Sequence, residues 1–302
     1  MHEKQNIFDG QKYFFTGFIY CMNINLLNYQ SPSQSVFKAK SLPQKFMPRD
    51  FYIRIPGYGR NPAWAEKIVE TAEDATIFIK RGWSFENIIK IISLGVAKAN
   101  RFPLDVEKRI HTGILRIERE GWQSPSSWKD FVLITNYDKK HGNRRYTSYE
   151  TRLDEKIKTP LKEVYKDISL TKPQHIVSVD VRKTLYHGAP NKINEAFRLV
   201  DKLYSFLLKK YLNKPLEEKD LNIINNCVAQ MRWILAHSTP WERGSDAISN
   251  VFMKSVYKAL NIKTYPPAKG ISFDMEAFCT DLAEYRKNFP VYFEKPPRLT
   301  KQ

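Results

Sequence analysis

The residues best placed to do chemistry lie in one polar loop that follows a histidine, HSTPWERGSD, residues 237–246. We call this stretch the motif loop. The imidazole of His237 has an ordinary pKa close to neutrality, so it is the natural candidate for a general base. Glu242 could hold Mg²⁺ together with substrate phosphates, and the guanidinium of Arg243 could bind phosphate through two parallel hydrogen bonds. The loop therefore predicts proton transfer beside a phosphate-containing ligand.

Each of these assignments has a plainer alternative. His237 is also what a helix favours in its last turn, where a histidine lies beside the C-terminal carbonyl groups. Glu242 is equally well explained as a surface partner of Arg243 or Arg232.

Two amphipathic helices must position the motif loop. Apolar residues recur at helical spacing on both sides of it, at Ile224, Val228, Met231, Ile234 and Leu235 and again at Ile248, Val251, Phe252, Val256 and Leu260. Pro240 ends the first helix, and Ser245 and Asp246 after Gly244 are good candidates to begin the second. The start of a helix presents free N–H groups and a partial positive charge, so Arg243, Gly244, Ser245 and Asp246 are predicted to bind an anion or phosphate.

The motif loop resembles the signature of the Fic/Doc (Fido) superfamily, H-P-F-x-(D/E)-G-N-G-R. From Pro240 the chain reads P-W-E-R-G-S-D, so that Pro240, Trp241 and Gly244 agree with the signature and Ser245 replaces its asparagine by a small polar residue. The chain departs from the signature at Thr239, where the histidine would precede the proline. It departs again at Arg243, in place of the metal-binding carboxylate, and at Ala247, in place of the final arginine.

The resemblance implies a transferase that modifies a protein side chain. The donor would be a nucleotide or nucleotide-sugar with a diphosphate, and it would give up a nucleotide, phosphorylated or sugar moiety. His237 and Glu242 would be catalytic, Glu242 would hold Mg²⁺, and an exposed Trp241 and Pro240 would shape the loop. A protein of this kind would act as a bacterial effector or toxin on a host protein.

A second resemblance to the same superfamily lies upstream, where residues 175–188 are predicted to form a β-hairpin flap before a long helix. By the resemblance, Arg182, Thr184, Tyr186 and His187 would meet a target segment by strand addition or cap the ligand. The alternative is an ordinary exposed hairpin. The run LYHG also resembles the NAD-binding strand of ADP-ribosyltransferases, but the long helices that follow argue against that class.

The pattern as a whole predicts a mostly α-helical, Fido-like bundle with the small β-hairpin flap. We expect a flexible extension over residues 1–50, a helical N-terminal lobe over 51–125, a core over 126–290 and a surface tail over 291–302. Helices are expected over 63–80, from Ser84, and from Asp105 through Ile117. The apolar run from Tyr13 is about ten residues long, too short to span a bilayer, and no clear signal peptide is present.

The composition leaves two further function classes open. The net charge of +17 favours an anionic partner, and basic residues interleave with aromatic residues near Lys139, Lys140, Arg144 and Arg145. A basic nucleic-acid-binding helical protein is therefore one alternative, and a catalytically inactive Fido-fold module that binds a nucleotide or a protein is the other. Three scattered cysteines indicate a reducing compartment, which fits the cytoplasm or secretion by a bacterium into a host cell.

Overall fold

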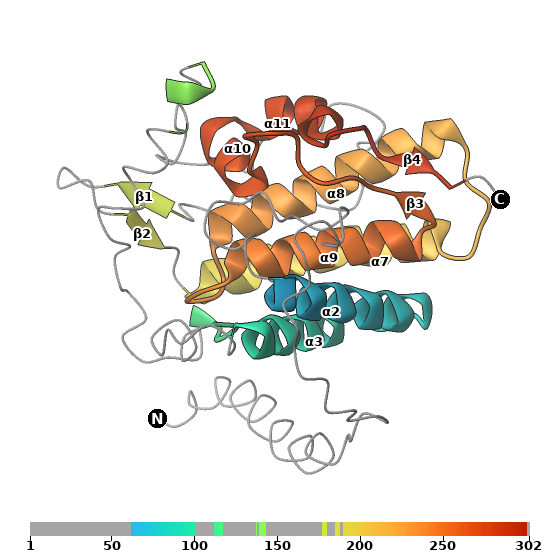
Figure 1. Ribbon diagram of the computed structural model, residues 1–302, viewed down its shortest axis with the longest axis horizontal. Coiled ribbons are helices and arrows are strands. Elements are labelled where there is room, and N and C mark those ends of the chain that lie inside the picture. Colours follow the sequence, from blue (N-terminus) through green and yellow to red (C-terminus); the bar gives the residue numbers. More distant parts are fainter. Residues whose placement is uncertain are drawn as a thin grey trace, which may run out of the picture. The chain divides into compact units, whose positions relative to one another are not determined.

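The computed structural model describes residues 62–100, 112–116, 137, 139–142 and 190–300, and the backbone of two strands at 177–179 and 185–187. The described helices are α2 (Pro62–Lys80), α3 (Phe85–Ala99), α7 (Pro190–Tyr211), α8 (Glu218–Ser238), α9 (Ser245–Ala259), α10 (Phe273–Cys279), α11 (Leu282–Asn288) and the 3₁₀ helix η3 (Phe289–Tyr292). The strands are β1 (Val177–Val179), β2 (Leu185–His187), β3 (Ile262–Lys263) and β4 (Arg298–Leu299). The predicted mostly α-helical fold with a small β-hairpin is confirmed (Figure 1).

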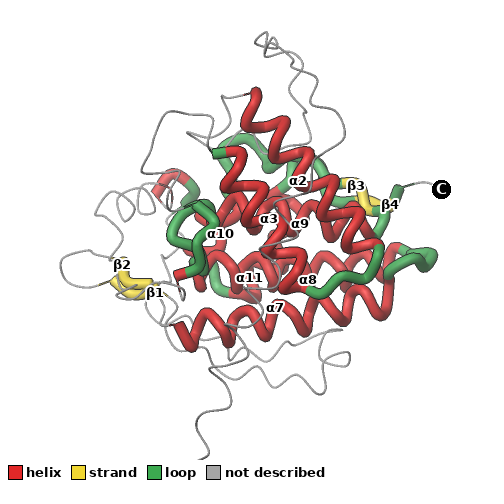
Figure 2. The backbone as a smooth tube through the Cα atoms, turned by 90° about the horizontal axis from the view of Figure 1, so that it is seen from below, coloured by secondary structure: helices red, strands yellow, loops and turns green. Residues whose placement is uncertain are grey.

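Helix α8 is the element around which the others pack. It contacts α7, α9, α10 and α11, and α9 in turn contacts α2 and α3 (Figures 1 and 2). From Cys227 to Ser238 every residue of α8 is buried, which is what a helix surrounded by other helices requires. A capping box between Glu217 and Asp220 fixes its start, and Thr239 ends it in the left-handed region with φ 38°. The two helices that hold the motif loop are thus core helices.

The N-terminal helices belong to the same hydrophobic core. Helices α2 and α3 both pack against α9, and their buried residues Ile68, Ile88 and Val96 lie in one cluster with those of α8 and α9. Helix α3 carries Gly95 where it crosses α2, and any side chain there would collide with Thr71. The lobe expected at 51–125 is therefore not separated from the core in its described residues, because the apolar faces of α2 and α3 need α9 to cover them.

The helix expected from Asp105 through Ile117 is corrected by the structure over residues 112–116. Residues 112–115 are not helical and instead form bridges to the motif loop, Thr112 with Arg243 and Leu115 with Trp241. Gly113, with φ 80°, leaves the helical region at its centre. A regular apolar spacing of isoleucines suggested a helix, but backbone pairing with a distant loop decided the conformation.

The segment expected to be a surface tail from residue 291 is also corrected. Tyr292 and Phe293 are buried in the hydrophobic core, and β4 pairs with β3 in an antiparallel ribbon. The two prolines at 296 and 297 suggested an extension, yet the aromatic residues just before them have large apolar surfaces to bury. No helix in the described part of the chain is both long and apolar enough to cross a membrane.

The hairpin predicted at 175–188 is present as the antiparallel pair β1–β2, with Val177 opposite His187 and Val179 opposite Leu185. Tyr186 and His187 lie on β2, whose backbone alone is described. Arg182 and Thr184 lie outside the described residues, as does the extension predicted at 1–50. The target-binding role of these four residues stays a prediction.

Candidate functional site

The motif loop is held from one side by a short backbone ladder. The amide of Glu242 donates to the carbonyl of Ile114 at 2.9 Å, and the amide of Gly113 donates to the carbonyl of Arg243 at 3.1 Å. The pairing satisfies backbone groups that a loop between two buried helices would otherwise leave without partners. The loop is therefore a fixed part of the fold rather than a flexible connection.

Arg116 completes this attachment and is a residue that the sequence did not single out. Its amide donates to Pro240 O at 2.8 Å, and its guanidinium donates to Thr239 O at 3.0 Å and to Glu242 O at 3.3 Å. The side chain is 6% exposed. Because a guanidinium has several donors in one plane, the side chain holds two carbonyl groups of the turn while the backbone amide of the same residue holds a third.

Replacing Arg116 by alanine should lower the free energy of unfolding by about 2–3 kcal/mol, because the loop carbonyls lose charge-assisted donors in a buried place. Arg116→Lys keeps the charge and should recover less than half of that loss, since an ammonium cannot reach the same carbonyls together. Urea unfolding would measure both variants. A loss below about 0.5 kcal/mol for the alanine variant would contradict this role.

The loop's own side chains stabilise its turn. Gly244 begins α9 in the left-handed region with φ 86°, and a Cβ there would lie 3.1 Å from Thr112. The hydroxyl of Ser245 donates to Trp241 O at 3.1 Å and accepts from Trp241 N at 3.3 Å. Trp241 is 1% exposed and packs on Phe197 with ring centroids 5.8 Å apart. The expected exposed tryptophan is thus a core residue, and the Ser245 hydroxyl is committed to the turn.

His237 lies inside the core. Its side chain is fully buried, its Nε2 lies 2.8 Å from Ala277 O, and its ring centroid lies 4.1 Å from that of Trp233. Burial lowers the pKa of His237 to about 4, and the hydrogen bond to Ala277 offsets this only in part. A ring enclosed in this way does not reach a target hydroxyl, so its position does not fit the predicted general base.

Of the other predicted residues, Glu242 and Arg243 reach the loop surface, Arg243 being exposed and Glu242 half-buried. In the described residues there is no group of three or more histidine, cysteine, aspartate or glutamate side chains arranged to hold a metal ion. Mg²⁺ at Glu242 stays a prediction.

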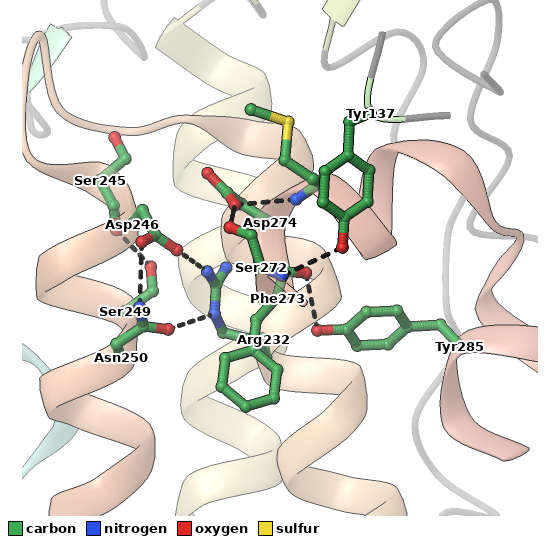
Figure 3. A network of polar contacts seen from close by, with 11 residues as sticks. Tyr137, Arg232, Ser245, Asp246, Ser249, Asn250, Ser272, Phe273, Asp274 and Tyr285 are labelled. Carbon is green, nitrogen blue, oxygen red and sulfur yellow. Dashed lines mark hydrogen bonds and ion pairs between the residues drawn. The ribbon is translucent and has the colours of Figure 1, made fainter. Parts of the chain in front are cut away.

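A buried arginine on α8 organises the polar side of the site (Figure 3). Arg232 is 1% exposed, forms an ion pair with Asp246, and donates through Nε to Asn250 Oδ1 at 3.0 Å. Asn250 Nδ2 donates in turn to Asp246 Oδ2 at 3.0 Å. Within the described residues, Nη1 of Arg232 has no hydrogen-bond partner. We call Arg232, Asp246, Asn250 and the neighbouring Asp274 the arginine centre.

Asp246 has an unusual pKa for a carboxyl group. Burial and, to a lesser extent, the nearby charge of Asp274 raise the pKa of Asp246 to about 7, while Arg232 and Asn250 act in the opposite direction. Its side chain is nevertheless 22% exposed. A partly accessible carboxylate that titrates close to neutral pH is able to take up and release a proton, which is why such groups mark candidate functional sites.

The first turn of α10 and its N-cap residue Ser272 lie beside the arginine centre. Asp274 accepts from Ser272 Oγ at 2.5 Å and from Met275 N at 2.8 Å. Tyr137 Oη donates to Glu276 at 2.8 Å and accepts from Ser272 N at 3.0 Å. Tyr137 lies near the lysines of the alternative nucleic-acid patch, and its hydroxyl serves this internal network, while Lys139 and Lys140 are exposed.

The sequence placed Asp246 in the site and missed Arg232 as one of its members. Arg232 lies among the apolar residues of α8, and a charged residue at a buried helical position signals a partner elsewhere in the chain. Asp246 was expected to join an anion-binding helix start. The structure gives it a different setting, as the carboxylate partner of that arginine.

The fold and the site define a helical protein with an enclosed arginine–carboxylate centre beside a fixed loop. Residues 146–296 of this chain match the AvrB/AvrC family, described as avirulence protein. The match spans 151 of the 302 residues, half of the chain, and the chain therefore belongs to the AvrB/AvrC avirulence protein family. Avirulence proteins of this family are bacterial effectors secreted into host cells, and they have host protein partners. Comparison with curated proteins found no match.

The family match overturns the Fic/Doc assignment made from the motif loop. The shared proline and glycine are what any tight connection between two helices needs, because proline ends a helix and glycine reaches the left-handed conformation at the next start. The residues that would have carried the chemistry were already different at Thr239, Arg243 and Ala247. Pro240 and Gly244 therefore agree with the Fic/Doc signature because both shape the turn, and this agreement carries no information about catalysis.

Proposed function

We propose that this effector acts on a host protein as a group transferase, with the arginine centre as its reactive site. The observation that supports this is the pairing of a partly exposed carboxylate, Asp246, whose pKa is about 7, with a buried arginine that keeps one N–H group uncommitted among the described residues. A proton acceptor and an anion-binding group in one place are the minimum that transfer from a phosphate-containing donor requires.

In the proposed reaction, Asp246 takes the proton of a hydroxyl group on the host protein. The hydroxyl oxygen forms a bond to the electrophilic atom of the donor, and the bond from that atom to the phosphate leaving group breaks with its electron pair. A carboxylate with a pKa near the working pH is half ionised and so can accept the proton efficiently. Asp246 replaces His237 in this role, since His237 is enclosed.

The donor would be a nucleotide or a nucleotide-sugar that carries a diphosphate. Arg232 Nη1 would donate to a phosphate oxygen, and the exposed guanidinium of Arg243 would neutralise charge at the loop surface. Glu242 beside Arg243 could share a Mg²⁺ ion with the phosphates, as one or two carboxylates suffice for that ion. The positive net charge of the protein favours the approach of such a donor.

A second candidate is a binding protein without catalysis. It is favoured by the closure of the motif loop, in which Ser245 Oγ is used by Trp241 and the carbonyls of Thr239, Pro240 and Glu242 are used by Arg116. A loop whose carbonyl acceptors and serine hydroxyl are already used in this way is better suited to present a surface than to rearrange around a substrate. In this case the arginine centre would fix the loop for contact with a host protein.

Thermal unfolding in the presence of ATP, GTP, NAD and nucleotide-sugars, with and without Mg²⁺, separates the candidates. At a hundred times the dissociation constant a ligand stabilises by about 2.7 kcal/mol. We expect one donor class to raise the melting temperature of the natural protein and of Asp246→Asn, but not of Arg232→Lys. If Arg232→Lys does not fold, Arg243→Ala, at an exposed position, takes its place.

Transfer itself is measured by incubating the protein with the radiolabelled donor and host-cell extract, and counting label in protein. The transferase predicts labelling by the natural protein and none by Asp246→Asn, whose amide cannot accept the proton. Binding of the donor without labelling of protein would exclude the transferase and favour the binding protein without catalysis. The absence of a melting shift with every donor would overturn the nucleotide-dependent function.

A further inference from the structure

A ribbon at the far end of α9 gathers positive charge around one tyrosine. In β3 and β4, Lys263 lies directly opposite Arg298. Further along the chain, Pro267 forms a bridge with Phe293. Tyr265 lies in the sequence between β3 and this bridge. Lys263 and Tyr265 are two positions apart on an extended segment, so they face the same side. The β3–β4 ribbon is visible beyond the C-terminal end of α9 in Figure 1.

Three cations converge on the Tyr265 ring. The distances to its centroid are 5.6 Å from Lys263 Nζ, 5.7 Å from Lys295 Nζ and 5.6 Å from Arg298 Cζ. All three charged residues are exposed and Tyr265 is half-buried. We call these four residues the Tyr265 cluster. Attraction between a cation and an aromatic face accounts for one or two of these contacts, since a ring has two faces.

The arrangement costs stability unless an anion occupies it. Like charges directly opposite on a β-ribbon are destabilising, which is the situation of Lys263 and Arg298. None of the three cations forms an ion pair with a carboxylate in the described part of the chain. A local conflict that the fold does not relieve is expected at functional sites. The Tyr265 cluster is thus suited to an external anion.

The size of the cluster indicates which anion. Because each charge lies within 5.7 Å of one centroid, no two charged atoms are more than about 11 Å apart. Duplex DNA is held by a track of about 6–10 phosphate contacts, and anionic membranes by clusters of about 4–8 basic residues. Three cations around one tyrosine ring are fewer than either of these partners uses, and their number suits one phosphate group, whose charge is close to −2 and whose oxygens accept several hydrogen bonds.

We propose that the Tyr265 cluster is a docking site for a phosphorylated serine or threonine on a host protein. Host protein partners follow from the family to which the chain belongs, and recognition of phosphorylated motifs by clustered basic residues is a general mode of peptide binding. The cluster follows the C-terminal end of α9, whereas Asp246 of the arginine centre lies in the first turn of this 15-residue helix. The inference is independent of the proposed transfer reaction.

Fluorescence anisotropy tests the proposal with a short labelled Gly/Ser peptide that carries one phosphoserine, at about 0.15 M salt. We expect saturable binding by the full chain, and none of the unphosphorylated peptide. The triple variant Lys263→Ala, Lys295→Ala and Arg298→Ala should bind at least about tenfold more weakly, since each lost charge-assisted contact contributes substantially. The nucleotide donor should raise the melting temperature of this triple variant by as much as it raises that of the natural protein.

The control is a second triple variant with the same change in net charge, Lys139→Ala, Lys209→Ala and Lys287→Ala, all exposed and remote from Tyr265 in sequence. It should bind the phosphopeptide within about twofold of the natural protein. Equal weakening by both variants would show general charge attraction and overturn the site. The proposal also fails if the phosphopeptide does not bind while duplex DNA or phosphatidylserine vesicles bind in a way that depends on the cluster.

Discussion

Replacing Arg232 by alanine should lower the free energy of unfolding by about 3–5 kcal/mol at about pH 8, the range for breaking a buried ion pair from one side. The physical reason is the carboxylate that remains. Asp246 is mostly enclosed, lies near Asp274 and loses its cationic partner, so its ionised form becomes unfavourable. Urea unfolding at several pH values measures the loss.

The loss should shrink as the pH falls toward about 7, because in the variant Asp246 has lost the arginine that lowers its pKa and takes up its proton above pH 7. The double variant Arg232→Met with Asp246→Asn should recover part of the stability, since it removes both charges and keeps the volume. A loss that does not change between about pH 6 and pH 8 would show that Arg232 acts through packing and not through its charge.

Asp246→Asn should reveal a pH dependence that comes from His237. The pKa of His237 is lowered to about 4 from 6.5, so between these values the unfolded chain binds a proton that the native protein does not. The free energy of unfolding then rises with pH, by about 1.4 kcal/mol per unit and about 3 kcal/mol in all, and the gain is lost as the pH falls below 6.5.

In the natural protein Asp246 opposes this trend. Its pKa is raised from 3.8 to about 7, so within that window the native protein holds a proton that the unfolded chain has released, and stability falls as the pH rises. The two contributions should largely cancel between about pH 4 and 6.5. Comparing Asp246→Asn with the double variant Asp246→Asn and His237→Gln isolates the histidine. Equal slopes in the two variants would mean that His237 titrates normally and is accessible.

Together these variants decide what kind of centre the effector contains. If Arg232 and Asp246 are coupled as charges, the site has the proton acceptor and the cation that the proposed transfer requires. If Arg232 and Asp246 stabilise the protein through packing alone, the results favour the binding protein without catalysis. The Tyr265 cluster is tested separately and would supply the docking of a host protein in either case.

The sequence by itself determined the helical elements. Period-3.6 spacing in α8 and α9, with Pro240 and Gly244 between them, is a local property and correctly predicted two core helices joined by a short turn. Ser84 likewise predicted the start of α3, which it caps. The hairpin followed from short β-type runs bounded by a glycine and a proline. Each depends on neighbours within a few residues.

Tertiary structure alone decided the chemistry of the site. His237 became a core histidine because α10 covers it, and the pKa of Asp246 rose because the side chain is buried near Asp274 of α10. The non-helical conformation of 112–115 arose from pairing with a loop more than a hundred residues away. Burial, charge pairing and backbone bridging depend on contacts that are distant along the chain, so no local pattern in the sequence records them.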